Sequence, residues 1–127
     1  MDIWCKSTLD YIIENSTVND NGCLIWNLGP YDTEKYKYGK IRLKLPNMDG
    51  KSKTYPVHRI CYYAFHQNIH EMNNYTQPFF EVSHLCHEPR CVRPEHLVQE
   101  SSAANANRRF CMSNKHCINC MPPCKFF

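Results

Sequence analysis

The chain has 127 residues, a mean hydropathy of −0.59 and a formal net charge of +3. This length corresponds to one domain with a modest core, and the low hydropathy excludes a membrane-spanning stretch. The first residues, Met1 to Cys5, lack the basic region and long apolar stretch of a signal peptide, so we expect an intracellular protein, nuclear if the source is eukaryotic and otherwise cytoplasmic. Nine cysteines in such a reducing compartment favour metal sites over disulfides.

Positive charge is concentrated in one part of the chain. Residues 35–59 hold eight basic side chains and a single acid, Asp49, whereas residues 1–34 hold six acids and one lysine. A concentrated basic segment suits a polyanion, because each neutralised phosphate releases condensed counterions. A solvated charged hairpin is the alternative that charge alone leaves open.

The first predicted elements are a helix and a short strand. The sequence from Ser7 to Asp10 resembles a capping sequence, and Leu9, Ile12 and Ile13 form an apolar stripe, so a short N-terminal helix is expected within residues 1–21. Turn residues at 19–22 then precede a predicted strand at residues 23–26.

A two-stranded ribbon is predicted next. Residues 40–45 alternate strictly, which places Ile41, Leu43 and Leu45 on a core-facing side and Lys40, Arg42 and Lys44 on the opposite side. A turn signal at residues 47–50 leads into residues 51–55, which alternate again and place Lys51 and Lys53 on one face. A ribbon of this width can enter a DNA major groove.

The second half of the chain is predicted to alternate between helix and strand. Residues 57–67 are expected to form a helix with Ile60, Cys61, Ala64 and Phe65 inward and Pro56 just before its start. A loop over 68–78 and a short strand over 81–84 follow. Ser101 or Ser102 can then cap a helix that runs to about Arg109 and carries Asn105.

Residues 83–97 contain the strongest motif. Cys86, Cys91 and His96 have the spacing C-x4-C-x4-H, at which three ligands can close round one Zn²⁺, and the fourth ligand must come from elsewhere. His84 lies two residues before the first ligand. In an extended segment its imidazole and the Cys86 side chain share a face, so the metal would support a histidine that it need not bind.

The C-terminus carries a second set of four cysteines within 14 residues, namely Cys111, Cys117, Cys120 and Cys124. This spacing matches a structural zinc knuckle, and the scarcity of apolar residues there makes a metal the expected source of order. His116 is an alternative ligand to Cys117, and a redox-active or disordered tail is the alternative to a metal site.

The remaining cysteines and histidines have simpler interpretations. Cys61 is expected to be a small core residue. Cys5 is an alternative to Cys23 as a metal ligand. His58 is expected to serve in packing or hydrogen bonding.

The run S-H-L-C-H-x-x-R-C-x-x-P-x-H-L, followed by an asparagine 21 positions after its first histidine, resembles the His-Me finger nucleases, specifically the His-Cys box homing endonucleases and the zinc-loop HNH proteins. The resemblance extends to residues 22–26, 38–42 and 57–60 and covers about residues 22–124. It implies that His84 is a general base, that Asn105 is the catalytic-metal ligand, and that Cys23 completes the first zinc site with Cys86, Cys91 and His96. It also implies that the basic ribbon binds double-stranded DNA.

Phosphodiester hydrolysis gives these roles a chemical reason. A neutral imidazole can deprotonate water near pH 7, and one hard divalent ion, Mg²⁺ with Mn²⁺ as a substitute, can relieve charge at the phosphate and at the departing oxygen. A single amide oxygen plus phosphate oxygens is a suitable first shell for Mg²⁺. Arg42 and Arg59 are the two candidates for an arginine beside the scissile phosphate.

We therefore predict an α+β protein with a ββα-metal core, a basic antiparallel ribbon and two structural zinc sites. Its single domain would comprise an N-terminal helix (1–21), the ribbon and core (22–110) and a zinc knuckle (111–127). The expected function is Mg²⁺-dependent DNA hydrolysis, and the competing hypothesis is a zinc-dependent DNA-binding module without catalysis. A double-strand cut at a palindrome needs two active sites, so a homodimer and a monomeric nicking enzyme both stay open.

Overall fold

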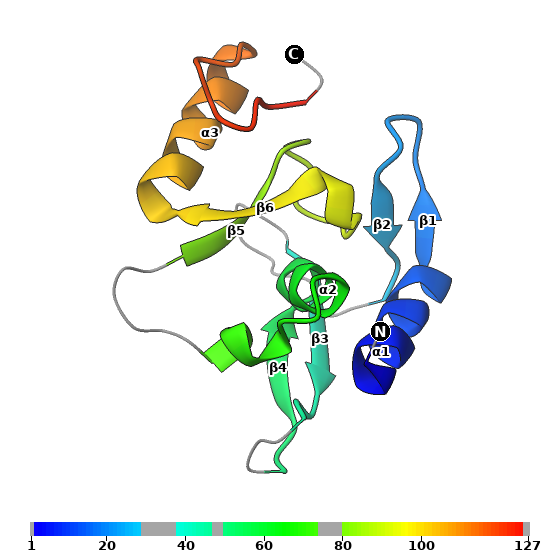
Figure 1. Ribbon diagram of the computed structural model, residues 1–127. Coiled ribbons are helices and arrows are strands. Elements are labelled where there is room, and N and C mark those ends of the chain that lie inside the picture. Colours follow the sequence, from blue (N-terminus) through cyan, green and yellow to red (C-terminus); the bar gives the residue numbers. More distant parts are fainter. Residues whose placement is uncertain (1, 29–37, 47–49, 74–79, 126–127) are drawn as a thin grey trace.

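A computed structural model describes residues 2–28, 38–46, 50–73 and 80–125. Within these ranges the chain forms α1 (Ile3–Glu14), β1 (Ser16–Val18), β2 (Leu24–Trp26), β3 (Lys40–Leu43), β4 (Lys53–Pro56), α2 (Val57–Phe65), the 3-10 helix η1 (Ile69–Asn73), β5 (Phe80–His84), the 3-10 helix η2 (Pro94–His96), β6 (Leu97–Ser101) and α3 (Ser102–Asn114). The strands pair into three separate antiparallel two-stranded sheets. The predicted α+β class is confirmed. Figure 1 shows α2 near the centre, with α1 and the β1–β2 hairpin on one side and α3 above β5 and β6.

The N-terminal helix begins earlier than expected. Asp2 is its N-cap, and the Asp2 carboxylate accepts a hydrogen bond of 3.1 Å from the Cys5 amide, so the expected cap at Ser7 is wrong. With the helix shifted, the buried stripe consists of Cys5, Leu9 and Ile12, and Ile13 is 48% exposed. This stripe packs against α2.

A hairpin that the sequence did not indicate follows the helix. Strand β1 pairs with β2 in the register Ser16↔Trp26, and Gly22 adopts φ +76° in the turn between them. Strand β1 is mostly exposed and has no alternating apolar pattern, which is why hydrophobic periodicity did not reveal it.

Strands β3 and β4 form the basic hairpin, defined here as residues 40–46 and 50–56, and the turn predicted at 47–49 lies outside the described residues. The register pairs Ile41 with Tyr55, Arg42 with Thr54 and Leu43 with Lys53. Ile41 and Tyr55 are buried on one face, and Arg42 is exposed on the other. Because paired residues share a face, Lys53 lies on the side opposite to Arg42, so the positive charge of the hairpin is divided between two faces.

Helix α2 provides the centre of the core. Val57, Ile60, Cys61 and Ala64 are all buried, as the predicted inward face required, but Phe65 at the end of the helix is 42% exposed. The core around α2 also includes side chains from α1, β2, β3, β4, η1, β5, the loop before η2, and β6: Leu9, Ile12, Trp26, Ile41, Tyr55, Met72, Val82, Val92 and Leu97.

Strands β5 and β6 and helix α3 are consecutive in the chain and pack together. The strands pair from Phe80↔Ser101 to His84↔Leu97, and the loop between them, residues 85–96, carries most of the first cysteine and histidine motif. Helix α3 begins at Ser102, with the Ser101 hydroxyl capping the Ala104 amide at 3.1 Å, and it packs on both strands. It continues five residues beyond the predicted end at Arg109, so Cys111 lies on this helix. No helix in the described ranges has both the length and the apolarity needed to cross a membrane.

Candidate functional site

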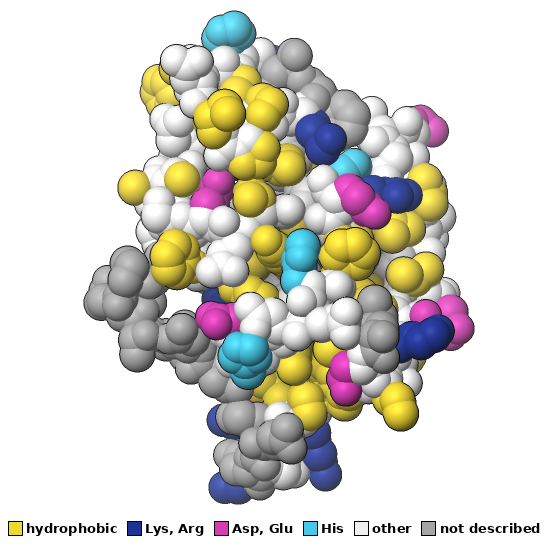
Figure 2. Space-filling view, viewed as in Figure 1, with side chains coloured by type: hydrophobic (Ala, Val, Ile, Leu, Met, Phe, Trp, Pro, Cys, Tyr) yellow, Lys and Arg dark blue, Asp and Glu magenta, His cyan; other side chains and the backbone are white. Residues whose placement is uncertain are grey.

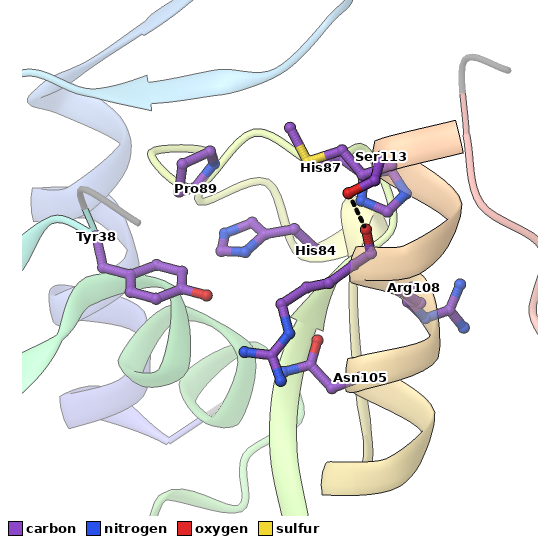
Figure 3. A pocket seen from close by; sticks show the side chains of 9 residues that line it. Tyr38, His84, His87, Pro89, Asn105, Arg108 and Ser113 are labelled. Carbon is purple, nitrogen blue, oxygen red and sulfur yellow. Dashed lines mark hydrogen bonds between the residues drawn. The ribbon is translucent and has the colours of Figure 1, made fainter. Parts of the chain in front are cut away.

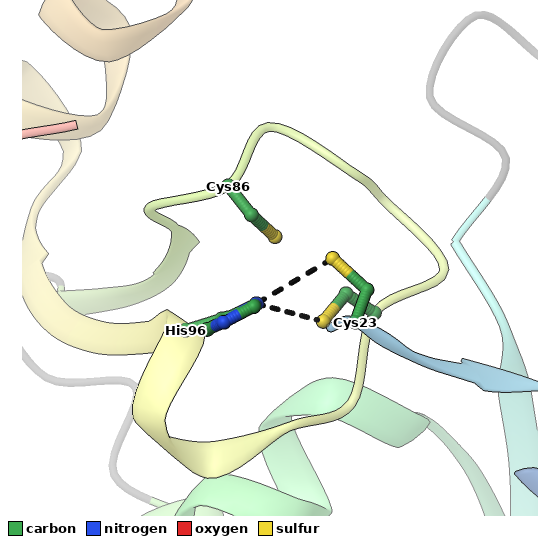
Figure 4. A group of neighbouring side chains, drawn as sticks. Cys23, Cys86 and His96 are labelled. Atoms are coloured by element: carbon green, nitrogen blue, oxygen red, sulfur yellow. Dashed lines mark hydrogen bonds between the residues drawn. The ribbon is translucent and has the colours of Figure 1, made fainter. Parts of the chain in front are cut away.

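The first ligand set is assembled as the sequence predicted. The side chains of Cys23, Cys86, Cys91 and His96 converge, and their ligand atoms all lie within 4.8 Å of one another (Figure 4). The Nδ1 atom of His96 is 3.4 Å from the Cys23 sulfur and 3.5 Å from the Cys91 sulfur. Two ligands at about 2.3 Å (sulfur) and 2.0–2.1 Å (nitrogen) from one tetrahedral zinc would lie about 3.6 Å apart, so the geometry fits Zn²⁺.

Backbone pairing explains how Cys23 reaches a motif more than 60 residues away. The Val92 amide donates to the Leu24 carbonyl at 2.8 Å, and the Trp26 amide donates to the Arg90 carbonyl at 3.2 Å, so the zinc loop pairs with β2. The Asn19 side chain accepts a bond of 2.9 Å from the Cys23 amide and fixes the turn. Sequence spacing supplied three ligands, and this pairing supplies the fourth.

The second ligand set is also assembled. The sulfurs of Cys111, Cys117, Cys120 and Cys124 all lie within 4.8 Å of one another, and the Cys111 and Cys120 sulfurs are 3.6 Å apart. Two sulfurs on one tetrahedral zinc lie about 3.8 Å apart. The ligand at the ambiguous position is Cys117, and His116 is outside the set and exposed.

Each set contains one thiol that is already acidic. Hydrogen bonding with Cys86 lowers the pKa of Cys91 to about 5. The backbone amide of Cys124, 3.3 Å from the Cys117 sulfur, lowers the pKa of Cys117 to about 7. Thiolate is the form that binds zinc, so both sets are prepared for a metal.

Arg108 connects the second set to the β5–β6 sheet. Its guanidinium is 2% exposed and donates two bonds to the Glu100 carboxylate, at 2.6 and 3.0 Å, one to the Pro122 carbonyl at 2.7 Å, and one to the Cys124 sulfur at 3.5 Å. The Lys125 amide also donates to the Leu85 carbonyl at 2.8 Å. The C-terminal knuckle is therefore bonded to the same strands that carry His84.

The two cysteines outside the sets are buried. Cys61 is 1% exposed, donates to the Val92 carbonyl at 2.9 Å, and has its pKa raised to about 12 by burial. Cys5 lies under α1 and is not among the ligands, so the alternative of Cys5 in place of Cys23 is not supported.

His84 and Asn105 line one cavity of about 380 Å³ between the zinc loop and α3 (Figure 3). His84 comes from the end of β5 and Asn105 from the second turn of α3. The other lining residues are Tyr38, His87, Pro89, Arg108, Arg109, Met112 and Ser113. The two residues that the motif paired at a distance of 21 positions therefore meet at one site.

The zinc loop fixes the tautomer of His84. Nitrogen Nε2 lies 2.9 Å from the carbonyl oxygen of Cys91, and a carbonyl can only accept, so Nε2 carries the hydrogen. Nitrogen Nδ1 of the neutral ring is then the acceptor. Burial lowers the pKa of His84 to about 4, so the ring is neutral at pH 7.

Three rings stack beside the cavity. The His84 and His58 ring centroids are 4.5 Å apart, and Tyr38 lies 5.0 Å from His58 and 5.8 Å from His84. His58 is buried, and its Nε2 lies 3.2 Å from the Val82 carbonyl, which is the hydrogen-bonding role expected for it. Tyr38 was not singled out by sequence, although it opens one of the segments that carried the resemblance.

Asn105 has a partner that sequence reasoning missed. Its amide nitrogen donates to the carboxylate of Glu81 on β5. Glu81 lies three residues before His84, and strand periodicity places the two on opposite faces, so no motif linked them.

The two candidate arginines lie outside this cavity. Arg42 borders a separate hollow beside Trp4 and Tyr11, and the Arg59 guanidinium lies 5.6 Å from the ring centroid of Tyr63. The arginines that line the cavity of His84 are Arg108 and Arg109.

Together these features define a small α+β protein in which two Cys/His tetrads suited to zinc support a histidine- and asparagine-lined cavity. The sequence matches the family described as the zinc-binding loop region of homing endonuclease over residues 22–125, and the chain belongs to that family. No solved structure matches the chain. The match confirms the resemblance to homing endonucleases that the motifs carried.

Proposed function

We propose that the chain is a Mg²⁺-dependent DNA endonuclease in which His84 is the general base. The observation that carries the proposal is the 2.9 Å bond from His84 Nε2 to the Cys91 carbonyl, because it leaves Nδ1 as a proton acceptor in a cavity that also holds Asn105. Membership of a nuclease-associated family supports the reaction class.

His84 takes the proton from the attacking water. In this step the water oxygen bonds to phosphorus, its proton moves to Nδ1, and the bond from phosphorus to the 3′ oxygen breaks. The departing oxygen is then protonated, which leaves 5′-phosphate and 3′-hydroxyl ends. The Cys91 carbonyl stabilises the imidazolium that forms, because it already accepts the hydrogen on Nε2.

Asn105 supplies a neutral oxygen ligand for the catalytic ion. A bound Mg²⁺ would withdraw charge from the phosphate oxygens and from the departing oxygen. The fit rests on donor chemistry, because hard divalent ions prefer oxygen ligands and Asn105 directs its amide nitrogen toward Glu81. Among the cavity residues, Arg109 is better placed than Arg42 or Arg59 to meet a phosphate near His84.

The basic hairpin is the proposed DNA-binding surface. Arg42, Lys44, Lys51 and Lys53 are exposed, Lys40 is half-buried, and Figure 2 shows Lys and Arg side chains on both sides of the projecting end of the hairpin. Charge on two faces suits a ribbon inserted between two phosphate backbones, since each face then meets one strand.

The sequence β5, zinc loop, β6, α3 supports the proposed ββα-metal core. Its two strands are antiparallel, its helix packs on both, and His84 and Asn105 come from the first strand and the helix. In the proposed domain layout this core unites residues 22–110, and α3 extends it into the C-terminal knuckle.

The test is cleavage of supercoiled plasmid by purified protein with Mg²⁺, with Mn²⁺, and with chelator. The proposal requires metal-dependent nicking or cutting with 5′-phosphate ends. If no DNA substrate is cut with either ion while DNA still binds, the chain is a zinc-dependent DNA-binding module without catalysis.

A further inference from the structure

We propose that Glu81 is a positioning residue that fixes the amide orientation of Asn105, so that the amide oxygen faces the catalytic cavity. The inference rests on the proposed function, because it assigns the oxygen of Asn105 to the metal. It concerns a residue of β5 that does not line the cavity with His84.

The hydrogen bond between the two residues determines which way the amide faces. An asparagine amide has a donor end and an acceptor end, and which atom faces which partner is decided by its hydrogen-bond network. The Glu81 carboxylate accepts from the Asn105 nitrogen. The Asn105 oxygen is consequently turned away from β5, and the side chain points into the view of the cavity in Figure 3.

Glu81 is itself held from a second side. The Ser102 hydroxyl donates to the other carboxylate oxygen of Glu81 at 2.9 Å. Ser102 and Asn105 are three residues apart on α3 and therefore share a face of the helix. One carboxylate thus connects the first turn of the helix with the metal-binding position one turn later.

The contact lies in an unusually polar helix–sheet interface. Glu81 is paired directly with Glu100 across the sheet, and like charges in that arrangement destabilise a strand pair. Each carboxylate instead finds its donors on α3: Glu81 meets Ser102 and Asn105, and Glu100 meets Arg108. Two apolar residues would pack a helix on this sheet without repulsion, so the directional bonds are the feature that a carboxylate at position 81 adds.

Loss of Glu81 would leave the amide free to turn over. The last torsion of asparagine is broad and roughly two-fold, so both orientations become accessible without the acceptor. Half of the ligand population would then present nitrogen, which does not bind Mg²⁺. Removing an outer-shell partner of this kind lowers metal affinity by about 10- to 100-fold.

Three variants separate positioning from other roles. Glu81→Ala removes the acceptor, and Glu81→Gln keeps an amide oxygen at the same place to accept the Asn105 nitrogen. Ser102→Ala, at an exposed position, removes only the bond that holds Glu81. Glu14→Ala, an exposed glutamate at the end of α1, is the matched control.

The first measurement needs neither Mg²⁺ nor DNA. The side-chain amide protons of Asn105, assigned by their disappearance in Asn105→Ala, are followed by hydrogen exchange in the zinc-loaded protein. Slow exchange of one proton is expected in wild type, Glu81→Gln and the Glu14 control, and fast exchange in Glu81→Ala. Fast exchange in wild type would overturn the proposal.

The second measurement is the Mg²⁺ concentration that gives half-maximal single-turnover cleavage. Glu81→Ala should raise it by about 10- to 100-fold, Ser102→Ala should raise it less, and Glu81→Gln should stay close to wild type with unchanged DNA affinity. An equal loss in Glu81→Gln and Glu81→Ala would show that the carboxylate itself is needed, which overturns positioning. Absence of wild-type cleavage defeats the proposed function, and the exchange measurement then still decides whether Glu81 holds Asn105.

Discussion

The two buried cysteines Cys91 and Cys61 offer a matched test of how metal binding stabilises the fold. Their exposures are 0% and 1%, so truncation of either removes the same kind of buried sulfur. Cys91 belongs to the first ligand set, whereas Cys61 packs in the core and donates one bond of 2.9 Å to the Val92 carbonyl.

The expected magnitudes differ widely. Replacing Cys61 with Ala removes a small core side chain and one weak hydrogen bond, a loss of about 1–2 kcal/mol that lowers Tm by about 3–10 °C in a chain of this length. Replacing Cys91 with Ala removes one of four ligands. A structural zinc contributes about 10–16 kcal/mol, and a domain of this size has a net stability of about 5–15 kcal/mol, so loss of the site should unfold the chain.

The assay combines thermal unfolding with zinc content for both variants and the wild type. Cys61→Ala should retain full zinc content and a cooperative transition at a lower temperature. Cys91→Ala should contain less zinc and show no cooperative transition. Equal destabilisation of the two variants, or a folded Cys91→Ala with full zinc content, would refute the division of the cysteines.

Four other outcomes follow from the same structure. The purified protein should contain about two zinc ions per chain and unfold with strong chelator, and one ion or none by elemental analysis would remove the second site. Neutralising Arg42 or Lys44 should weaken DNA binding and reduce the salt slope by about one for each phosphate contact, whereas unchanged affinity after replacement of both, with Lys53, would move the binding surface elsewhere. Asn105→Ala should raise the Mg²⁺ requirement and lower the maximal rate while zinc content and DNA affinity stay unchanged, and an unaltered Mg²⁺ titration would deny it a ligand role. Burial holds the pKa of His58 well below its usual range, so the unfolded chain takes up a proton near pH 6.5 that the folded chain does not, and stability must fall as pH is lowered below about 6.5; His58→Gln should remove up to about 1.4 kcal/mol per pH unit of that slope, and identical slopes in unfolding titrations would contradict the buried neutral ring.

The ligand sets were predictable because metal chemistry restricts both residue type and spacing. Cys86, Cys91 and His96 lie within 11 residues, and the four C-terminal cysteines lie within 14. Cys23 could be assigned only through the family resemblance, since its approach depends on the pairing of β2 with the zinc loop. That pairing is a tertiary contact between segments with no common pattern.

Element boundaries were less predictable where local signals competed. Ser7 offered a capping sequence, but Asp2 captured the helix start because its carboxylate reaches the Cys5 amide. The knuckle boundary at residue 111 failed for the opposite reason, because α3 continues to Asn114 and brings Cys111 to the second set on a helix.

The polar surroundings of the cavity were beyond sequence reasoning. Glu81 bonds Asn105 and Tyr38 stacks near His84, and neither contact has a fixed spacing from the motif. The role of an arginine at the scissile phosphate was sought at Arg42 and Arg59 from the resemblance, whereas the cavity itself brings Arg109 near His84. Side chains that meet through folding alone leave no periodic signal in the chain.

The most direct test of the central claim compares the single-turnover rates of DNA cleavage by wild type, His84→Ala and the control His70→Ala in Mg²⁺. His84 belongs to neither ligand set and His70 is exposed, so zinc content, fold and DNA affinity should be the same in all three. Cleavage by His84→Ala should be slower than wild type by at least about 10²- to 10⁴-fold, the range attributed to general base catalysis, and His70→Ala should cleave at the wild-type rate. Cleavage by His84→Ala at the wild-type rate would contradict the assignment of His84 as the base.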